Sequence, residues 1–350
     1  MVDISQEILG FTASDEAVIL YTMKNSSGAE VKLINIGAAI VSVNVPDNKG
    51  QMRDVVLGFK MYDKYVGDGA AHGKSVGRFA NRIAKGRFTL DDVEYTLATN
   101  NGPNALHGGP TGFMNRVWES RVETDRVVFN YVAAPGEEGY PSEIGVEAVY
   151  DWSEDNELEI TYFASTDGAT IVNLTNHVYF NLNGEGSGDI HSHTLKLNAE
   201  NFLPTDETQI PTGEFAPVAG TPMDFREPKA IGAEIDADFE PLVIGHGYDH
   251  CWVIDNHKAG VMTPAAELYS PESGIKLDVA TTQPGVQIYT GNWLTGCGMG
   301  KCGKEHQNRD GVAIECQNFP DAPNKPHFPS PVIRKGEVYE QHITFKFSVK

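Results

Sequence analysis

Short β-rich runs separated by turn sequences recur along almost the whole of this 350-residue chain. Ser-Glu-Asp-Asn at 153–156 and Pro-Glu-Ser-Gly at 271–274 each join two such runs, which predicts β-hairpins. Helical periodicity is weak, and the best candidates for short helices are 60–66 and 228–232. The predicted strands are 17–23, 30–36, 39–45, 117–122, 126–131, 144–152, 157–164, 193–197, 250–254, 266–270, 275–281, 286–289, 312–319 and 341–347.

Many short strands with few helices predict an all-β fold. The chain is 40% hydrophobic, enough for a sizeable core at this length. We therefore expect a large antiparallel β-sandwich, in which two sheets pack face to face and the helices are few and short. Because no linker-like run or repeat of fixed period interrupts the sequence, we expect one domain spanning residues 1–350.

The charge balance restricts the partners. The formal net charge is −21, and a surface of that sign repels phosphate backbones and anionic membranes, so we expect neither nucleic acid nor a membrane as partner. The sequence has no apolar run of the roughly 20 residues that span a bilayer, and its start does not resemble a secretion signal. Four cysteines in 350 residues do not make a disulfide framework, so we expect a cytoplasmic protein.

The most informative stretch is 170–184, TIVNLTNHVYFNLNG, read with the two-residue period of a strand. One set of alternate positions is almost wholly apolar, and the other carries His177, Tyr179 and Asn181. A strand of this kind buries one face and offers the other to a polar partner. Imidazole, phenol and amide groups suit a neutral ligand rich in hydroxyls, although an ordinary half-exposed strand has the same alternation.

A second two-faced strand is predicted at 312–319, VAIECQNF, where Glu315 lies on the face opposite Ile314 and Cys316. If this strand and 170–184 share a sheet, the imidazole of His177 and the carboxylate of Glu315 face one cleft. A histidine with a pKa near 6.5 and a glutamate whose pKa burial raises above about 4.3 form an acid/base pair that works near neutral pH. Either residue alone is weak evidence.

Four other segments place polar groups in tight loops or at strand ends, where sites gather. Asn81 and Arg82 lie in a loop with glycine at both ends, and His107 precedes two glycines. Asp249 enters a predicted strand and Gln283 leaves one. A solvated loop is the alternative interpretation for the arginine, and a simple turn is the alternative for His107.

The sequence does not support a metal or nucleotide site. Cys297, Cys302 and His306 lack the paired spacing of zinc ligands, and His191 with His193 has no suitably spaced carboxylate. No phosphate-binding loop or nucleophile elbow is present. We therefore expect no cofactor and no metal.

Eight motifs, in one order along most of the chain, resemble those of the aldose 1-epimerase (galactose mutarotase) family. They are GRFANRIAKGRF (77–88), NALHGG (104–109), TNHVYFNLNG (175–184), FLPTDETQIPTGE (202–214), GTPMDFREP (220–228), GYDH (247–250), TTQPGVQIYTGN (281–292) and ECQNFPDAPN (315–324).

The resemblance implies a galactose mutarotase-like sandwich that interconverts the anomers of a free monosaccharide such as galactose or glucose. It implies Glu315 as general base, His177 as general acid and His107 as a group that positions or polarises the ring oxygen. Asn81, Arg82, Asp249 and Gln283 would hold the remaining hydroxyls. We expect a monomer or a weak homodimer.

Three alternatives stay open from the residues alone. An epimerase of hexose 6-phosphates would need several basic groups at one end of the cleft, and Arg82 is the one clear candidate. A non-catalytic sugar-binding protein would not need Glu315 or His177. A glycoside hydrolase would need two carboxylates beside the bond that it cleaves, for which Asp249 and Glu315 could serve.

Overall fold

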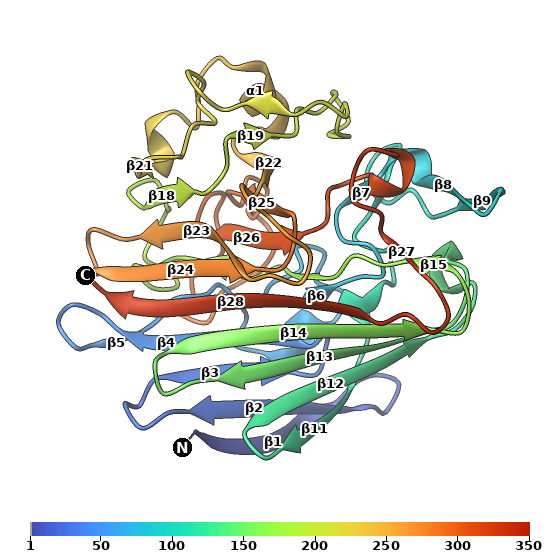
Figure 1. Ribbon diagram of the computed structural model, residues 1–350. Helices are drawn as coiled ribbons and strands as arrows, with labels where there is room; N and C mark the ends of the chain where they lie inside the picture. The colour runs from blue at the N-terminus through green and yellow to red at the C-terminus, as the bar shows by residue number, and fades with distance from the viewer. Residues whose placement is uncertain (1) are drawn as a thin grey trace.

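The computed structural model describes residues 2–350, and its largest element is a nine-stranded antiparallel sheet that faces the viewer in Figure 1. In spatial order its strands are β11 (Glu119–Glu123), β12 (Arg126–Ala133), β13 (Ile144–Trp152), β14 (Glu157–Thr166), β28 (Tyr339–Val349), β24 (Ile275–Thr281), β23 (Thr263–Tyr269), β18 (Thr194–Leu197) and β21 (Lys229–Ala230). The hairpins predicted at 153–156 and 271–274 join β13 to β14 and β23 to β24, as expected.

Two further antiparallel sheets contribute to the opposite side of the core. The five-stranded sheet, in blue behind β11–β14 in Figure 1, contains β1 (Asp3–Phe11), β2 (Ala17–Lys24), β3 (Glu30–Ile34), β4 (Ala39–Pro46) and β5 (Met52–Asp54). The six-stranded sheet contains β17 (Tyr179–Phe180), β26 (Val312–Gln317), β25 (Gly285–Tyr289), β22 (Asp249–Val253), β19 (Asn201–Phe202) and β20 (Ala216–Pro217). Backbone hydrogen bonds from Leu57 to Tyr179 and from Asn181 to Val55, both 2.9 Å, tie the two sheets together.

The remaining strands are short and form pairs: β6 (Ser75–Val76) with β16 (Thr175–Asn176), β7 (Arg82–Ile83) with β10 (Ala105–Leu106), β8 (Arg87–Leu90) with β9 (Val93–Thr96), and β15 (Thr170–Ile171) with β27 (Val332–Ile333). The 3-10 turns are η1 (Tyr62–Tyr65), η2 (Ala84–Gly86), η3 (Phe113–Asn115), η4 (Glu137–Gly139), η5 (Ile231–Ala233) and η6 (Ala322–Asn324). Within residues 2–350, the one α-helix is α1 (Glu240–Gly245), and no helix there has the length and apolar character needed to cross a membrane.

The core lies between the nine-stranded sheet and the other two. The ring of Tyr21 on β2 packs 5.7 Å from that of Phe129 on β12, and Phe180 on β17 packs 5.2 Å from Phe345 on β28. Strand alternation produces this core, since every second side chain of β13 from Ile144 to Trp152 points into it. Each large apolar side chain buried in this way contributes about 1.5–3 kcal/mol. The predicted fold class, an all-β sandwich with few short helices, is confirmed.

The stretch 170–184 differs from the prediction of one continuous strand. It forms three two-residue strands, β15, β16 and β17, which pair with β27, β6 and β26 respectively. The polar side chains explain the interruptions, because they bond to the backbone of other segments in place of a regular ladder. Asn173 Nδ2 donates to Ala80 O and Asn318 O, each at 3.2 Å. Both sets of alternate side chains are buried, so the stretch has no solvent face.

The helix predictions were also inexact. Segment 60–66 contains only the 3-10 turn η1, and 228–232 contains strand β21 and the start of η5. The sequence did not predict α1, which is only six residues long and has Pro241 in its first turn. A helix of that length cannot display a full amphipathic period, which explains why it was missed.

Candidate active site

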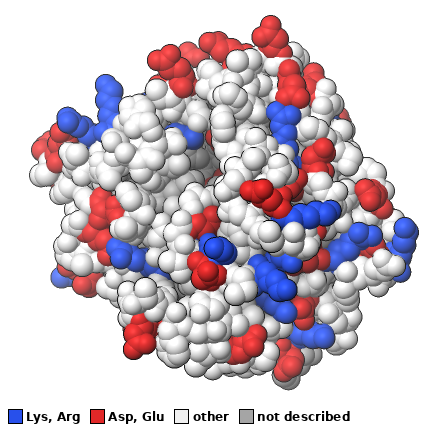
Figure 2. Space-filling view, turned by 180° about the vertical axis from the view of Figure 1, so that it is seen from behind, with Lys and Arg blue, Asp and Glu red and all other residues white. Residues whose placement is uncertain are grey.

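A cavity of about 640 Å³ lies on the side of the six-stranded sheet that faces away from the core. On β26, Ile314 and Cys316 belong to the core, so Glu315 between them points the other way, as the alternation predicted. Figure 2 shows the molecule from behind, and acidic and basic side chains are interspersed over the face seen there. The cavity is lined by Asp63, Lys64, Val66 to Ala71, Asn81, Arg82, Asn101, Leu106, His107, His177, Tyr179, Gln209, Asp249, Tyr289, Trp293, Gly296, Cys297 and Glu315.

His177 and Glu315 meet at the floor of this cavity. The Nε2 atom of His177 lies 3.5 Å from Oε1 of Glu315. Both residues are buried, and neither Nδ1 of His177 nor Oε2 of Glu315 has a hydrogen-bond partner among residues 2–350. Buried polar atoms are rarely left without a partner, so these two mark a place built for a polar ligand.

The backbone around His177 is fixed by the segment before β6. His177 N donates to Lys74 O at 2.8 Å, and Gly73 N donates to His177 O at 3.1 Å. Glycine is required at position 73, because its φ is +68° and an added Cβ would lie 1.9 Å from Ile40 O. The backbone that carries the imidazole is therefore held at both the N–H and the carbonyl of residue 177.

Burial shifts the acid/base properties of the pair in opposite directions. It raises the pKa of Glu315 well above the ordinary value, an effect that the charge of Asp249 reinforces and that of Arg82 opposes. Burial also lowers the pKa of His177 to about 4. The carboxylate of Glu315 thereby becomes a stronger base and protonated His177 a stronger acid.

His107 stands beside His177 with its ring nearly perpendicular, and the two ring centroids are 5.3 Å apart. The backbone N–H of Asn81 donates to Nδ1 of His107 at 3.2 Å. Since Nδ1 is the acceptor, the neutral ring carries its proton on Nε2 and can donate from there. Burial lowers the pKa of His107 well below the usual value, which keeps the ring neutral. Gly108 is explained by packing, since a Cβ there would lie 2.0 Å from Gly77 O.

Arg82, Asp249 and two glutamines form a hydrogen-bonded network on another wall. Arg82 Nη2 lies 3.6 Å from Asp249 Oδ2 and donates to Gln209 Oε1. Gln209 Nε2 donates to Asp249 Oδ2 at 2.8 Å, and Gln287 Nε2 donates to Asp249 Oδ1 at 2.6 Å. The Asp249 carboxylate is therefore held at both oxygens, with its charge balanced by the guanidinium.

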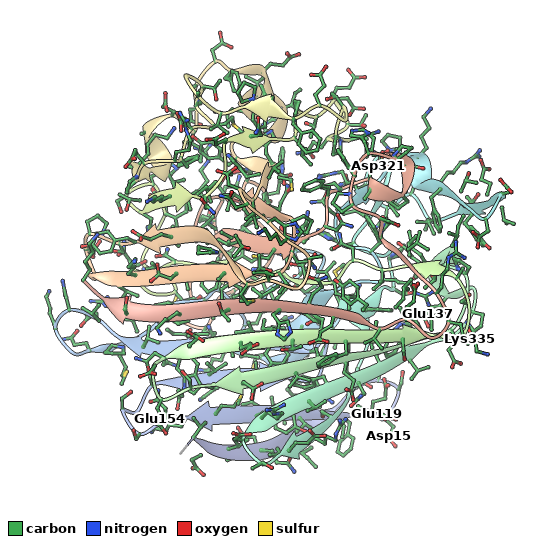
Figure 3. The ribbon with its side chains drawn as sticks, viewed as in Figure 1. Asp15, Glu119, Glu137, Glu154, Asp321 and Lys335 are labelled. Carbon is green, nitrogen blue, oxygen red and sulfur yellow. The ribbon has the colours of Figure 1, made fainter. Side chains whose placement is uncertain are left out.

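Asp321, labelled in Figure 3, connects the end of the segment after β26 to the arginine. Its backbone N–H donates to Arg82 O at 2.8 Å, and its Oδ1 accepts from Ala84 N at 2.9 Å. Lys325 Nζ lies 3.0 Å from its Oδ2. This buried aspartate thus fixes Arg82 relative to the strand that carries Glu315.

Six of the seven predicted site residues line this one cavity, namely Asn81, Arg82, His107, His177, Asp249 and Glu315. The structure does not bring Gln283 to it. Gln283 is buried elsewhere, where its Nε2 donates to Tyr339 OH at 3.0 Å and to Leu174 O at 3.3 Å. Gln287, four residues later, pairs directly opposite Glu315 and contacts Asp249.

Sequence reasoning also missed Gln209, Tyr289 and Trp293, which line the cavity. Gln287 could have been found from the alternation of β25, which places its side chain on the other face of the strand from the apolar Val286 and Ile288. Gln209 could not, because it lies in a loop with a φ of +62° where no periodicity operates.

His107, His177 and Glu315 each offer one atom that could bind a metal ion, and these atoms lie within 4.8 Å of one another. However, the bond from Asn81 N–H occupies Nδ1 of His107 and leaves a proton on its Nε2. A metal would have to displace that bond. The donor set is therefore better suited to a hydroxyl-bearing ligand than to a cation.

Comparisons with known proteins agree on one family. A sequence model described as aldose 1-epimerase matches residues 20–346. The chain belongs to the aldose 1-epimerase family. Among its relatives, galactose mutarotase from Sus scrofa is 42% identical over 349 residues, with all of both chains covered, and that from Homo sapiens is 41% identical over the same length. Aldose 1-epimerase from Escherichia coli K12 is 38% identical over 331 residues, or 94% of each chain.

Solved structures of the family have the same fold. An aldose epimerase homologue from C. elegans superposes with a TM-score of 0.85 at 32% sequence identity, covering all of this chain and 99% of that one. Galactose 1-epimerase from Lactobacillus acidophilus superposes with a TM-score of 0.87 at 26% identity, with the same coverage. The family resemblance and the galactose mutarotase-like fold expected from the motifs are thus confirmed.

Proposed function

We propose that this chain is an aldose 1-epimerase, an isomerase that interconverts the α and β anomers of free hexoses, with Glu315 as base and His177 as acid. The observation that carries the assignment of roles is the 3.5 Å separation of His177 Nε2 and Glu315 Oε1 in one cavity. The anomeric hydroxyl and the ring oxygen of a pyranose are both bonded to C1. A base and an acid that serve these two oxygens must therefore lie side by side, as these two groups do.

The reaction needs only proton transfers. Glu315 takes the proton of the anomeric hydroxyl while the bond between C1 and the ring oxygen breaks, and the ring oxygen receives a proton from His177. The product is the open-chain aldehyde, which turns about the C1–C2 bond. Ring closure on the other face of the carbonyl uses the same two groups with their roles exchanged. Each such transfer typically accelerates a reaction 10²–10⁴-fold.

The other cavity residues would hold the sugar. His107, with a proton on Nε2, can donate to the ring oxygen or a neighbouring hydroxyl. Arg82 and Asn81 supply donors, and Asp249, fixed by Gln209 and Gln287, accepts from hydroxyls. These groups are rigid before the sugar arrives, which reduces the entropy lost on binding.

Galactose and glucose are the proposed substrates, and relatives named galactose mutarotase and galactose 1-epimerase support galactose. A hexose 6-phosphate is disfavoured because, among residues 2–350, only two cationic side chains line the cavity, Lys64 and Arg82. Arg82 already faces Asp249, so little positive charge remains for a phosphate.

We further propose a cytoplasmic location and a monomer or weak homodimer. All four cysteines are free thiols, which suits a reducing compartment. Light scattering coupled to size-exclusion chromatography tests the oligomeric state, and a stable trimer or larger assembly would contradict it.

Polarimetry on freshly dissolved α-D-galactose and α-D-glucose tests the activity. We expect the optical rotation to reach equilibrium faster with the protein than with the same protein after heat denaturation. An oligosaccharide incubated with the protein should yield no new reducing ends. New reducing ends without faster mutarotation would favour a glycoside hydrolase that uses Asp249 and Glu315, and would overturn the proposal.

A further inference from the structure

We propose that the indole of Trp293 is a stacking platform for the apolar face of the bound sugar and gives this enzyme a preference for galactose over glucose. The inference rests on the proposed function, because it names the sugar that the same cavity selects. Of the four tryptophans in the chain, Trp118, Trp152 and Trp252 are at most 3% exposed, whereas Trp293 is 59% exposed.

Trp293 lines the cavity that contains His177 and Glu315. Its backbone N–H donates to the hydroxyl of Tyr289 at 3.1 Å, and the Tyr289 ring lies 6.2 Å from that of His177. One aromatic ring thus separates the backbone of Trp293 from the proposed acid. A hexose placed against His177 and Glu315 therefore has the aromatic wall of Tyr289 and Trp293 beside it.

The indole is held in place despite its exposure. The imidazole of His246 packs against it at 4.6 Å with an interplanar angle of 65°. His246 is the C-terminal cap of α1 and has a left-handed backbone, with φ of +53°. An edge contact from His246 leaves other indole surface free, so the side chain is a supported platform rather than a loose surface group.

Much of the rest of the site is polar, while Val66, Leu106 and Tyr289 add apolar surface to its lining. Arg82, Asn81, His107 and Asp249 are hydrogen-bonding groups, and Tyr179 is buried against His177 at 4.9 Å. Covering the exposed indole with a sugar removes apolar area from water, which contributes roughly 25 cal/mol per Å². The sugar with the larger continuous apolar face gains more from this contact.

Galactose has such a face. Its axial C4 hydroxyl points to one side of the ring, so the hydrogens on C3, C4, C5 and C6 form a continuous apolar patch on the other side. In glucose the C4 hydroxyl is equatorial, and both faces mix polar and apolar groups more evenly. A flat aromatic wall therefore discriminates between two sugars that differ only at C4.

Steady-state polarimetry of Trp293→Ala and Trp293→Phe tests the proposal, with Phe11→Ala as the matched control. Phe11 is an exposed aromatic residue, 56% exposed, on β1 and outside the cavity. We expect Trp293→Ala to raise the KM for galactose about tenfold and that for glucose less than about threefold, with kcat little changed. Trp293→Phe, which keeps a ring, should recover most of the loss, and Phe11→Ala should have no effect.

An equal change in the two KM values, or no change, would overturn the proposed preference.

A second readout does not depend on catalysis. Because the other three tryptophans are buried, acrylamide should quench mainly the fluorescence of Trp293, and saturating galactose should protect it more than glucose does. Equal or absent protection would contradict the platform. If galactose protects Trp293 from quenching but the protein does not accelerate mutarotation, the stacking role of Trp293 is supported and the proposed activity is contradicted.

Discussion

His177 Nε2 lies 3.5 Å from Glu315 Oε1. His177 comes two residues before Tyr179 on β17, Glu315 comes two residues after Ala313 on β26, and Tyr179 pairs with Ala313. In an antiparallel pair, a step back on one strand matches a step forward on the other. The register of two short strands thus brings the acid and the base together.

The two histidines should respond differently to replacement by glutamine. Glutamine at 107 keeps an N–H donor near the position of Nε2, so His107→Gln should stay within about tenfold of the wild-type rate if His107 only donates a hydrogen bond. Glutamine at 177 cannot transfer a proton, so His177→Gln should lose about 10²–10⁴-fold. The comparison is made by kcat for galactose mutarotation. Equal losses in the two variants would contradict these separate roles.

Gln209 should matter for substrate binding. It bonds both Arg82 and the Asp249 carboxylate, so Gln209→Leu leaves two charged groups less well held. We expect KM for galactose to rise about tenfold, the equivalent of about 1.4 kcal/mol, with kcat within about threefold. Steady-state polarimetry separates the two constants. A fall in kcat at unchanged KM would show that Gln209 serves the chemical step instead.

Gln283 supplies a matched contrast, since it was predicted to hold a hydroxyl but is buried against Tyr339 and Leu174. Gln283→Leu should lower the free energy of unfolding by about 1–3 kcal/mol, because the Leu174 carbonyl and the tyrosine hydroxyl lose a donor. The KM for galactose should stay unchanged. Urea unfolding and polarimetry on the same preparation measure both quantities, and a raised KM at unchanged stability would restore Gln283 to the site.

His193 should make stability depend on pH. It is fully buried and its Nε2 accepts from Leu182 N–H at 2.9 Å, and burial lowers its pKa to about 4. The unfolded histidine, with a pKa near 6.5, binds a proton that the folded one refuses. The contribution of neutral His193 to the free energy of unfolding is therefore complete above about pH 6.5 and is lost as the pH falls toward 4. The loss is roughly 2 kcal/mol at pH 5.

Urea unfolding of the wild type and of His193→Gln at pH 7.5 and pH 5 measures this contribution. Glutamine can accept the Leu182 N–H bond without titrating, so the variant should lose less stability between the two pH values. An identical loss in both proteins would assign the pH dependence to other groups, such as His72 and His250, whose pKa values burial also lowers.

Local periodicity explains what the sequence could predict. Strands with one buried face, such as β13, were predicted at their observed bounds, because alternation follows from the pleat. Glu315 was placed on the correct face for the same reason. The stretch 170–184 was wrongly predicted as one continuous strand. Side chains such as Asn173 there bond to the backbone of segments distant in the chain, which no local pattern encodes. The position of Gln287 is not encoded locally either, since only pairing between strands sets it opposite Glu315.

Polarimetry of Glu315→Gln tests whether Glu315 is the general base. The amide keeps the size of the side chain but cannot accept the proton of the anomeric hydroxyl. We predict that the acceleration of α-D-galactose mutarotation falls by at least about 10²-fold, while circular dichroism and the galactose protection of Trp293 from acrylamide match the wild type. A folded, sugar-binding Glu315→Gln protein that mutarotates galactose at the wild-type rate would contradict the account.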